Sequence, residues 1–445
     1  MHKSRKRWAA PAAVLTAAVL ALTGCGANSA PATEDGKSVV TFWQQKFEDY
    51  QQAWFKEQVE EYNASQDDVV VKLQVVPADT WDQKLKAAQA AGKQPDVRTT
   101  SYGNIKPGVA NGHFAELGEL MDAEAFDDIQ PNVQDFVTSE GGYYAYPLLV
   151  EPSTVLFYRT DLFEAAGLDP DTPPTSWAEL VEASRALTKD GVYGMNIGQV
   201  ALDLAWSSWG LQYNAAGDLP IAEDWSEANA TDPAYLELAD FYGTLYQEKL
   251  MPQEATYPYA DCSFYGEGTV AMSACGSWAI GQLSGNPDWK EVLANTAVAA
   301  FPSADGDQTT PTSTLGGWTL TVDAKSKAKE GAADFISWLV AGEPERMVDF
   351  FKASGYSKYP ARISVGEALA ADPEASGNPF LTVVSETILP YAKAEPAYPW
   401  DISVAFGTAL EKAMKGGDAA AAFEEAQVAI DGVIEKQKLA GTNPQ

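Results

Sequence analysis

Ser38-Val39-Val40-Thr41-Phe42-Trp43 opens the part of the chain whose pattern decides the fold. These residues are mostly β-branched or aromatic, a composition typical of a strand. Residues 47–62 follow with apolar side chains near helical spacing, and residues 69–76 return to a strand composition. Residues 80–92 then predict a second helix, and residues 95–97 lead into a third strand. This β-α-β-α-β alternation predicts a mostly parallel, doubly wound α/β sheet.

Two short motifs predict where helices begin. Thr80-Trp81-Asp82-Gln83 and Ser176-Trp177-Ala178-Glu179 each place a hydroxyl residue three positions before Gln or Glu. That spacing is the signature of a capping box, in which the two side chains bond each other's backbone N–H groups. We therefore expect helices to start at both positions.

The alternation of strands and helices restarts further along the chain. Residues 143–158 are strand-like, and no long linker separates them from what precedes. We therefore expect two α/β lobes in close contact. The later segments predict helices at 203–211, 234–250, 328–340, 343–353 and beyond 398, and strands at 296–301 and 318–322.

The N-terminus has the features of a secretory signal peptide. A basic start is followed by an apolar stretch, residues 9–22, that is too short and too rich in Ala to be expected to span a membrane. Leu22-Thr23-Gly24-Cys25 resembles the bacterial lipobox, which implies lipidation of Cys25, whereas the alternative is an ordinary cleavage site. We expect a signal peptide at 1–24 and a lipidated, flexible tether at 25–37, holding the protein at the extracellular face of the cytoplasmic membrane.

Composition excludes several classes of function. The chain has 62 acidic and 30 basic residues, a net charge of −32, which disfavours nucleic-acid binding. Of its two histidines, His2 lies in the signal peptide and His113 is expected in a surface turn, so no histidine-rich metal site is available. No phosphate-binding glycine motif is present. We expect no cofactor and no metal.

Cys262 and Cys275 remain once Cys25 is assigned to the lipid. An even pair in an oxidising compartment favours a disulfide. Two buried free thiols are the alternative.

Several segments together resemble the extracellular solute-binding proteins of ABC importers, specifically the carbohydrate-binding group that includes maltodextrin-binding proteins. The resemblance extends from about Val39 to Ile434, and its most specific part is Phe264–Met272 followed by Gly276-Ser277-Trp278. The other segments are Val40–Trp43, Gly92–Val97, Tyr146–Glu151, Leu156–Phe163, Gly316–Trp318 and Tyr359–Arg362.

The resemblance implies a periplasmic-binding-protein-like fold. Two doubly wound α/β lobes would be joined by three crossings, near residues 148, 301 and 356, with a ligand cleft between them. The N-terminal lobe would comprise residues 38–148 and 302–355, and the C-terminal lobe residues 149–301 and 356–440.

Aromatic residues at strand and loop ends suit a sugar, because indole rings cover the apolar faces of its ring. Trp278 and Trp400 match ligand-stacking positions of the family, and Trp43 and Trp318 have similar settings; core packing is the alternative for each. Trp206, Trp209 and Tyr213 have spacings that would put them on one helical face. The first two match a family region that supplies stacking residues, although such a stripe also suits a core.

Polar candidates would bond the sugar hydroxyl groups. Glu151 is the strongest, because it matches a ligand-bonding carboxylate just after the first crossing; an exposed acidic residue is the alternative. The remaining candidates are Gln44, Gln45, Arg98, Tyr102, Gly317, Tyr356, Arg362 and Asp401.

The resemblance therefore implies a lipid-anchored, monomeric receptor, without enzymatic activity, that captures a glucose-based oligosaccharide and delivers it to an ABC transporter permease. A secreted glycoside hydrolase is the main alternative, because it also uses Trp platforms and needs two carboxylates about 5–9.5 Å apart. An oligopeptide receptor is a third reading.

Overall fold

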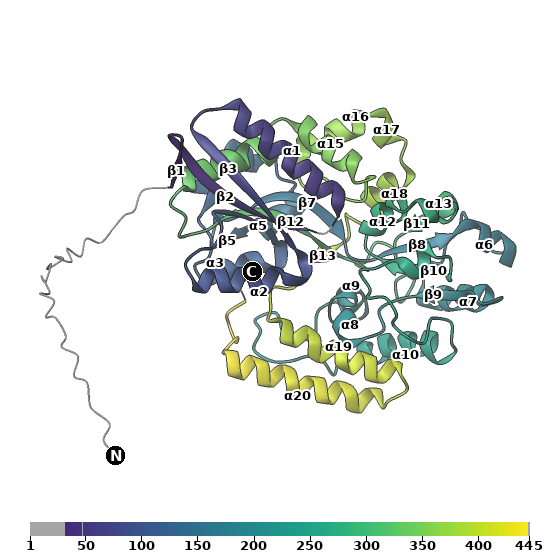
Figure 1. The fold of residues 1–445 in the computed structure, drawn as a ribbon. Helices are drawn as coiled ribbons and strands as arrows, with labels where there is room; N and C mark the ends of the chain where they lie inside the picture. Colours follow the sequence, from purple (N-terminus) through teal and green to yellow (C-terminus); the bar gives the residue numbers. More distant parts are fainter. Residues whose placement is uncertain (1–31, 47, 444–445) are drawn as a thin grey trace, which may run out of the picture.

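The computed structural model describes residues 32–46 and 48–443. The expected signal peptide at 1–24 and the lipidated Cys25 lie outside these residues. Figure 1 shows two α/β lobes, one around strands β2, β3, β7 and β12 and the other around β8 to β11. Within the described part of the chain, no helix has the length and apolar character needed to cross a membrane.

The first lobe contains a seven-stranded sheet in the order β1-β2-β4-β12-β13, with β3 beside β2 and β7 beside β12. β2 is parallel to β3 and β4, as the opening alternation predicts. β12 is antiparallel to β4 and β7, because it enters this sheet from the other lobe instead of through a helical crossover. The strands are β1 Thr33–Glu34, β2 Lys37–Lys46, β3 Val69–Pro77, β4 Val97–Ser101, β7 Tyr146–Pro152, β12 Thr314–Val322 and β13 Lys393–Ala394.

The second lobe contains a four-stranded sheet in the order β11-β8-β10-β9. β8 is antiparallel to both of its neighbours, and β9 is parallel to β10. These strands are β8 Val155–Arg159, β9 Tyr193–Asn196, β10 Val270–Cys275 and β11 Thr296–Ala299. A separate hairpin joins β5 Thr138–Ser139 to β6 Gly142–Tyr143.

Helices fill the intervals between the strands. Before β7 these are α1 Asp49–Ser65, α2 Trp81–Ala90, α3 Ile105–Ala110, α4 Glu124–Asp127 and α5 Pro131–Val137. Between β8 and β12 they are α6 Thr160–Ala166, α7 Trp177–Leu187, α8 Ala201–Ser207, α9 Trp209–Ala216, α10 Pro233–Gln247, α11 Ser263–Gly266, α12 Trp278–Gly285 and α13 Lys290–Ala294. After β12 they are α14 Lys329–Ile336, a π-helical turn at Ser337–Ala341, α15 Pro344–Ala353, α16 Ile363–Ala371, α17 Pro373–Ser376, α18 Pro379–Thr387, α19 Trp400–Met414 and α20 Ala419–Gln437.

The expected strand at 143–158 is two strands in different sheets. β7 ends at Pro152 in the first sheet and β8 begins at Val155 in the second. The connection is bonded to the second crossing, because the Thr154 N–H donates to Ser313 Oγ at 3.0 Å. The chain thus leaves the first sheet after Pro152 instead of near residue 148. The lobe boundaries implied by the resemblance stay a prediction.

The segment after α15 contacts both lobes. Tyr359 exchanges backbone hydrogen bonds with Val150 of β7, at 2.9 and 3.0 Å. α18 packs against β11 of the second sheet, whereas β13 returns to the first sheet beside β12. The resemblance implied a single crossing near residue 356, whereas the chain contacts the second sheet through α18 and the first through β13 before α19 begins.

The folded body begins earlier than expected. Residues 33–37 belong to the segment interpreted as a flexible tether, yet β1 pairs with the start of β2. Asp35 and Gly36 both have positive φ, 50° and 89°, which suits the turn of a two-residue hairpin. The expected tether at 25–37 is therefore wrong for Thr33–Lys37.

Only one of the two expected capping boxes forms. The Ser176 side chain accepts a hydrogen bond from the Glu179 backbone, and Glu179 bonds back, so this prediction is confirmed. The box at Thr80 is wrong, because Thr80 ends a 3₁₀ turn in a helical conformation (φ −106°, ψ −3°). Its hydroxyl instead donates to the Pro77 carbonyl at 3.3 Å.

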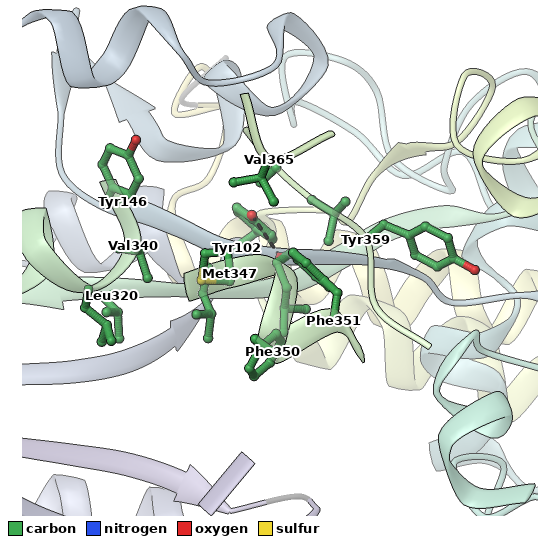
Figure 2. Packing of buried hydrophobic residues seen from close by; sticks show 14 of the residues in the cluster. Tyr102, Tyr146, Leu320, Val340, Met347, Phe350, Phe351, Tyr359 and Val365 are labelled. Carbon is green, nitrogen blue, oxygen red and sulfur yellow. Dashed lines mark hydrogen bonds between the residues drawn. The ribbon is translucent and has the colours of Figure 1, made fainter. Parts of the chain in front are cut away.

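Each lobe has its own buried apolar cluster. Figure 2 shows part of the first, which includes Phe350 and Phe351 of α15, Tyr146 of β7 and Leu320 of β12. These side chains are fully or almost fully buried. Tyr146 and Leu320 pair at the start of β7 and the end of β12, whereas the opposite ends of these strands, at Pro152 and Thr314, connect to the other lobe.

Candidate ligand-binding cleft

A pocket of roughly 310 Å³ lies between the two lobes. The first lobe contributes the end of β7 and the glycines of β12, and the second contributes α8 and the start of α12. Its lining residues are Glu48, Gln51, Ser101, Glu151, Ser153, Trp206, Ala260, Trp278, Gln282, Gly316, Gly317, Trp318, Lys358 and Glu395. Five residues singled out from the sequence meet here: Glu151, Trp206, Trp278, Gly317 and Trp318.

Three indole rings line this pocket. The ring centroids of Trp206 and Trp278 are 5.9 Å apart, and those of Trp206 and Tyr259 are 5.0 Å apart with the two rings nearly perpendicular. The Trp278 N–H donates to the Ala260 carbonyl at 3.0 Å, which fixes its ring. A Cβ at Gly276 would lie 1.9 Å from the Trp278 ring, so the motif Gly276-Ser277-Trp278 needs glycine for this close approach.

The glycines of β12 bring the first lobe close to the pocket. Gly317 has φ +136°, and a Cβ there would lie 2.3 Å from the Leu149 carbonyl oxygen. A Cβ at Gly316 would lie 2.2 Å from a carboxylate oxygen of Glu395. Gly317 therefore requires glycine, whereas a side chain at Gly316 would displace Glu395, and Trp318 follows both into the lining.

A buried ion cluster supports Glu151. Lys358 Nζ contacts both the Glu151 carboxylate and, at 3.3 Å, that of Glu48, while the Lys358 side chain is only 4% exposed. Burial lowers the pKa of Lys358, but the two carboxylates outweigh it and raise that pKa above its usual value. Burial raises the pKa of Glu151, and Lys358 and a hydrogen bond from Trp318 offset only part of that.

Glu395 is a second acidic residue of the pocket. Burial, and then the nearby Glu151 carboxylate, raise its pKa to about 8. It also lines a larger neighbouring cavity of about 1000 Å³, together with Tyr102, Lys106 and Lys393. Glu395 therefore lines both the tryptophan-lined pocket and this larger cavity.

The Cys262–Cys275 disulfide is present, as predicted. It ties the start of α11 to the end of β10, next to the loop that carries Ala260. The Ala260 carbonyl accepts N–H groups from both Trp278 and Gln282, at 3.0 and 2.9 Å. The disulfide therefore secures a loop on which a wall of the pocket depends.

The structure does not bring two arginine candidates to the pocket. Arg98 Nη1 lies 3.0 Å from Asp323, both side chains are almost fully buried, and its guanidinium rests 4.8 Å from the Phe114 ring centroid. Arg362 pairs with Asp128 at 2.7 Å and donates to the Val340 carbonyl. Both form internal ion pairs.

The residues at the end of β2 also lie outside the pocket lining. Trp43 packs edge-on against Trp81, with Lys84 Nζ at 4.9 Å from its ring. Gln44 is buried, and its side-chain amide donates to the Gln45 carbonyl. The backbone N–H of Gln45 donates to the Thr99 hydroxyl.

Tyr102 and Tyr356 are both buried. The Tyr102 hydroxyl donates to the Leu149 carbonyl at 3.0 Å, which holds β7 beside Gly317. Burial raises the pKa of Tyr102 well above its usual value. Tyr356 has φ +58°, and its buried hydroxyl has no hydrogen-bond partner among the described residues.

The expected face of Trp206, Trp209 and Tyr213 does not form, because the helix breaks at Ser208, between α8 and α9. Trp209 turns into the core and donates to Ser403 Oγ at 3.0 Å. Trp400 stands edge-on to it at 6.2 Å, is 46% exposed, and does not line the pocket. Asp401 is exposed in the first turn of α19.

Lys358 and Glu395 were missed by the sequence analysis. Lys358 directly precedes Tyr359–Arg362, one of the segments that carry the family resemblance, and that position is the only signal that could have identified it. Glu395 gives no local signal. Among residues 32–46 and 48–443, no group of three or more His, Cys, Asp or Glu side chains is arranged to hold a metal ion.

The known proteins that this chain resembles are binding proteins of one kind. The family model described as bacterial extracellular solute-binding protein matches residues 48–343. The chain is 27% identical over 288 residues to the mannitol-binding protein of Pseudomonas aeruginosa, covering 62% of this chain and 63% of that relative. It is 27% identical over 366 residues to the lactose-binding protein of Rhizobium radiobacter, covering 79% of each.

Among solved structures, the cyclic alpha-maltosyl-1,6-maltose binding protein from Arthrobacter globiformis superposes with a TM-score of 0.73 at 26% identity. The superposition covers 90% of this chain and 100% of that one. The match to the mannitol-binding relative spans less than two thirds of that protein's length.

Proposed function

Because this chain belongs to the bacterial extracellular solute-binding proteins, we propose that it captures a carbohydrate between its two lobes and delivers it to an ABC transporter permease. The observation that carries the proposal is the convergence of Trp206, Trp278 and Trp318 on one pocket. Indole faces match the apolar faces of a sugar ring, and polar groups beside them match its hydroxyls.

The ligand is proposed to be an oligosaccharide built from glucose. The cavity of about 1000 Å³ that shares Glu395 with the tryptophan-lined pocket offers room for further sugar units. Two of the relatives are named for lactose and for a maltosyl-maltose, which supports a ligand of more than one ring.

Binding is proposed to favour closure of the lobes. A ligand that contacts Trp318 of β12 and Trp278 of α12 at once stabilises the arrangement in which both are near. The chain would act as a monomer, anchored by lipid at Cys25 to the extracellular face of the membrane. The lipobox-like Leu22-Thr23-Gly24-Cys25 supports that anchor.

One observation favours a glycoside hydrolase as the second candidate. Glu151 and Glu395 line the same pocket and differ in environment, since one is paired with Lys358 and the other is not. Carboxylates with separated pKa values can serve as acid and nucleophile. The contacts of Glu151 with Lys358 and Trp318 argue for the receptor, because they occupy the oxygens a nucleophile would need.

A thermal-shift screen across mono- and oligosaccharides, with oligopeptides as a parallel set, tests the proposal. A ligand present at a free concentration 100 times its Kd stabilises the folded state by about 2.7 kcal/mol and raises the melting temperature. The same mixtures are then analysed for shorter sugar products. Stabilisation by a sugar without turnover supports the receptor, and turnover supports the hydrolase. Stabilisation by peptides alone supports an oligopeptide receptor.

A further inference from the structure

Several hydrogen-bond donors of the pocket are already in use. Trp278 and Gln282 donate to the Ala260 carbonyl, and the Trp318 indole bonds Glu151. Lys358 is directed at Glu48 and Glu151. A ligand group that needs donors from the protein therefore finds few on these side chains.

Acceptors, in contrast, are left open. Gln51 is 4% exposed, and among the described residues its carbonyl oxygen accepts no hydrogen bond, while its amide makes only a 3.4 Å contact with Tyr50. Neither oxygen of Glu395 has a hydrogen-bond or ion-pair partner in residues 32–46 and 48–443. One oxygen of Glu48 is buried without a partner in the part of the chain that the structure describes. A ligand would bury these acceptors, and a buried acceptor without a donor is costly, so the pocket suits a ligand rich in donors.

The charge of the pocket also favours a ligand rich in hydrogen-bond donors, in particular a cation. Three carboxyl groups, on Glu48, Glu151 and Glu395, line the same pocket as one ammonium group, on Lys358. Glu48 and Glu151 contact that ammonium group, whereas Glu395, whose pKa is raised to about 8, keeps its proton at pH 7 when no ligand is bound. A neutral ligand leaves Glu395 protonated, whereas an ammonium group beside it favours the ionised form, lowers its pKa and pairs with the carboxylate. The net charge of −32 on the whole chain also attracts cations toward the cleft.

The indole rings add an independent attraction for a cation. Trp206, Trp278 and Trp318 line the same pocket as the acidic residues. The negative face of an indole ring attracts ammonium groups, most strongly where water is excluded. An ammonium group has three N–H donors and no acceptor, which matches the open acceptors described above.

Resting on the proposed function, we propose that the preferred ligand is an amino sugar with a free, protonated amine, and that Glu395 is the residue that selects it. The amine pairs with the Glu395 carboxylate and donates to the Gln51 carbonyl. The sugar rings stack on the tryptophans. N-acetylation removes the charge and adds an acceptor, so it weakens binding.

A matched ligand series tests this selection. Glucose, glucosamine and N-acetylglucosamine, with their β-1,4-linked di- to tetrasaccharides, differ only at the C2 substituent. Titration calorimetry on the full chain at pH 7 is expected to give the free amines at least about tenfold higher affinity than the acetylated or hydroxyl forms. Salt screens ion pairs, so this preference shrinks between 20 and 500 mM NaCl.

Glu395→Gln is expected to reduce the preference to about threefold or less, whereas Glu435→Gln, at an exposed position on α20, leaves it unchanged. Equal or weaker binding of the amines, or a preference that survives in Glu395→Gln, overturns the inference and leaves the receptor intact. If Glu395→Gln does not fold, the salt series on the unaltered chain takes its place: a preference that shrinks with salt supports the inference, and one that does not change overturns it. If neither this series nor the wider sugar screen binds, the proposed function itself fails.

Discussion

Replacing Lys358 with Met tests the buried ion cluster that supports the cleft. Met has a similar length but no charge, so the substitution leaves the Glu48 and Glu151 carboxylates facing each other without a cation. Removing one partner of a buried pair costs about 3–5 kcal/mol, because the remaining charge is desolvated and uncompensated. The Lys358 side chain is 4% exposed and contacts two carboxylates, so we expect a loss in this range.

Urea unfolding at pH 7, followed by tryptophan fluorescence, measures that loss. Lys415→Met is the matched control, because Lys415 forms an i,i+4 pair with Glu411 at an exposed site and should cost less than about 1 kcal/mol. Adding Glu151→Gln to Lys358→Met should restore part of the stability, because it removes one of the unpaired charges. A change below 1 kcal/mol for Lys358→Met would refute the reasoning.

Three further outcomes are expected. Replacing both Cys262 and Cys275 with Ser removes a cross-link between residues 13 apart and should lower the free energy of unfolding by about 3 kcal/mol, measured by urea unfolding; no change beyond error contradicts it. Gly316→Ala places a methyl group against Glu395 and should weaken ligand binding about tenfold by calorimetry, whereas Gly285→Ala, which meets no atom within 4 Å, should not. The raised pKa of Glu395 means that the folded chain retains a proton that the unfolded chain releases, so this group lowers stability as the pH rises from its usual carboxyl range to about 8; Glu395→Gln should flatten the fall in melting temperature across that window, and an identical pH profile counts against the assignment.

Local patterns predicted much of the fold. The alternation that begins at Ser38 specifies β2, β3 and β4 as parallel neighbours, because each strand and helix is coded by adjacent residues. The same composition could not say that residues 143–158 are divided between two sheets, since strand propensity carries no information about partners. The antiparallel direction of β12 likewise depends on contacts with strands more than 150 residues away.

The site was predictable only where a motif surrounds the residue. Trp278 follows a glycine, Gly276, that its ring requires, and Trp318 follows two glycines that a strand otherwise disfavours. Glu395 is one of 62 acidic residues, and only folding places it against Gly316 and near Glu151. Arg98 and Arg362 show the converse, because charge suggested ligand contact while their partners, Asp323 and Asp128, lie far away in sequence.

The most direct test of the account is whether a sugar contacts both lobes. Titration calorimetry with the best sugar from the screen should show that Trp318→Ala in the first lobe and Trp278→Ala in the second each weaken binding by about 1–3 kcal/mol. Trp400→Ala, outside the tryptophan-lined pocket, should have the smaller effect. Unchanged affinity in either Trp318→Ala or Trp278→Ala, with the variant folded, would contradict a ligand held between the lobes.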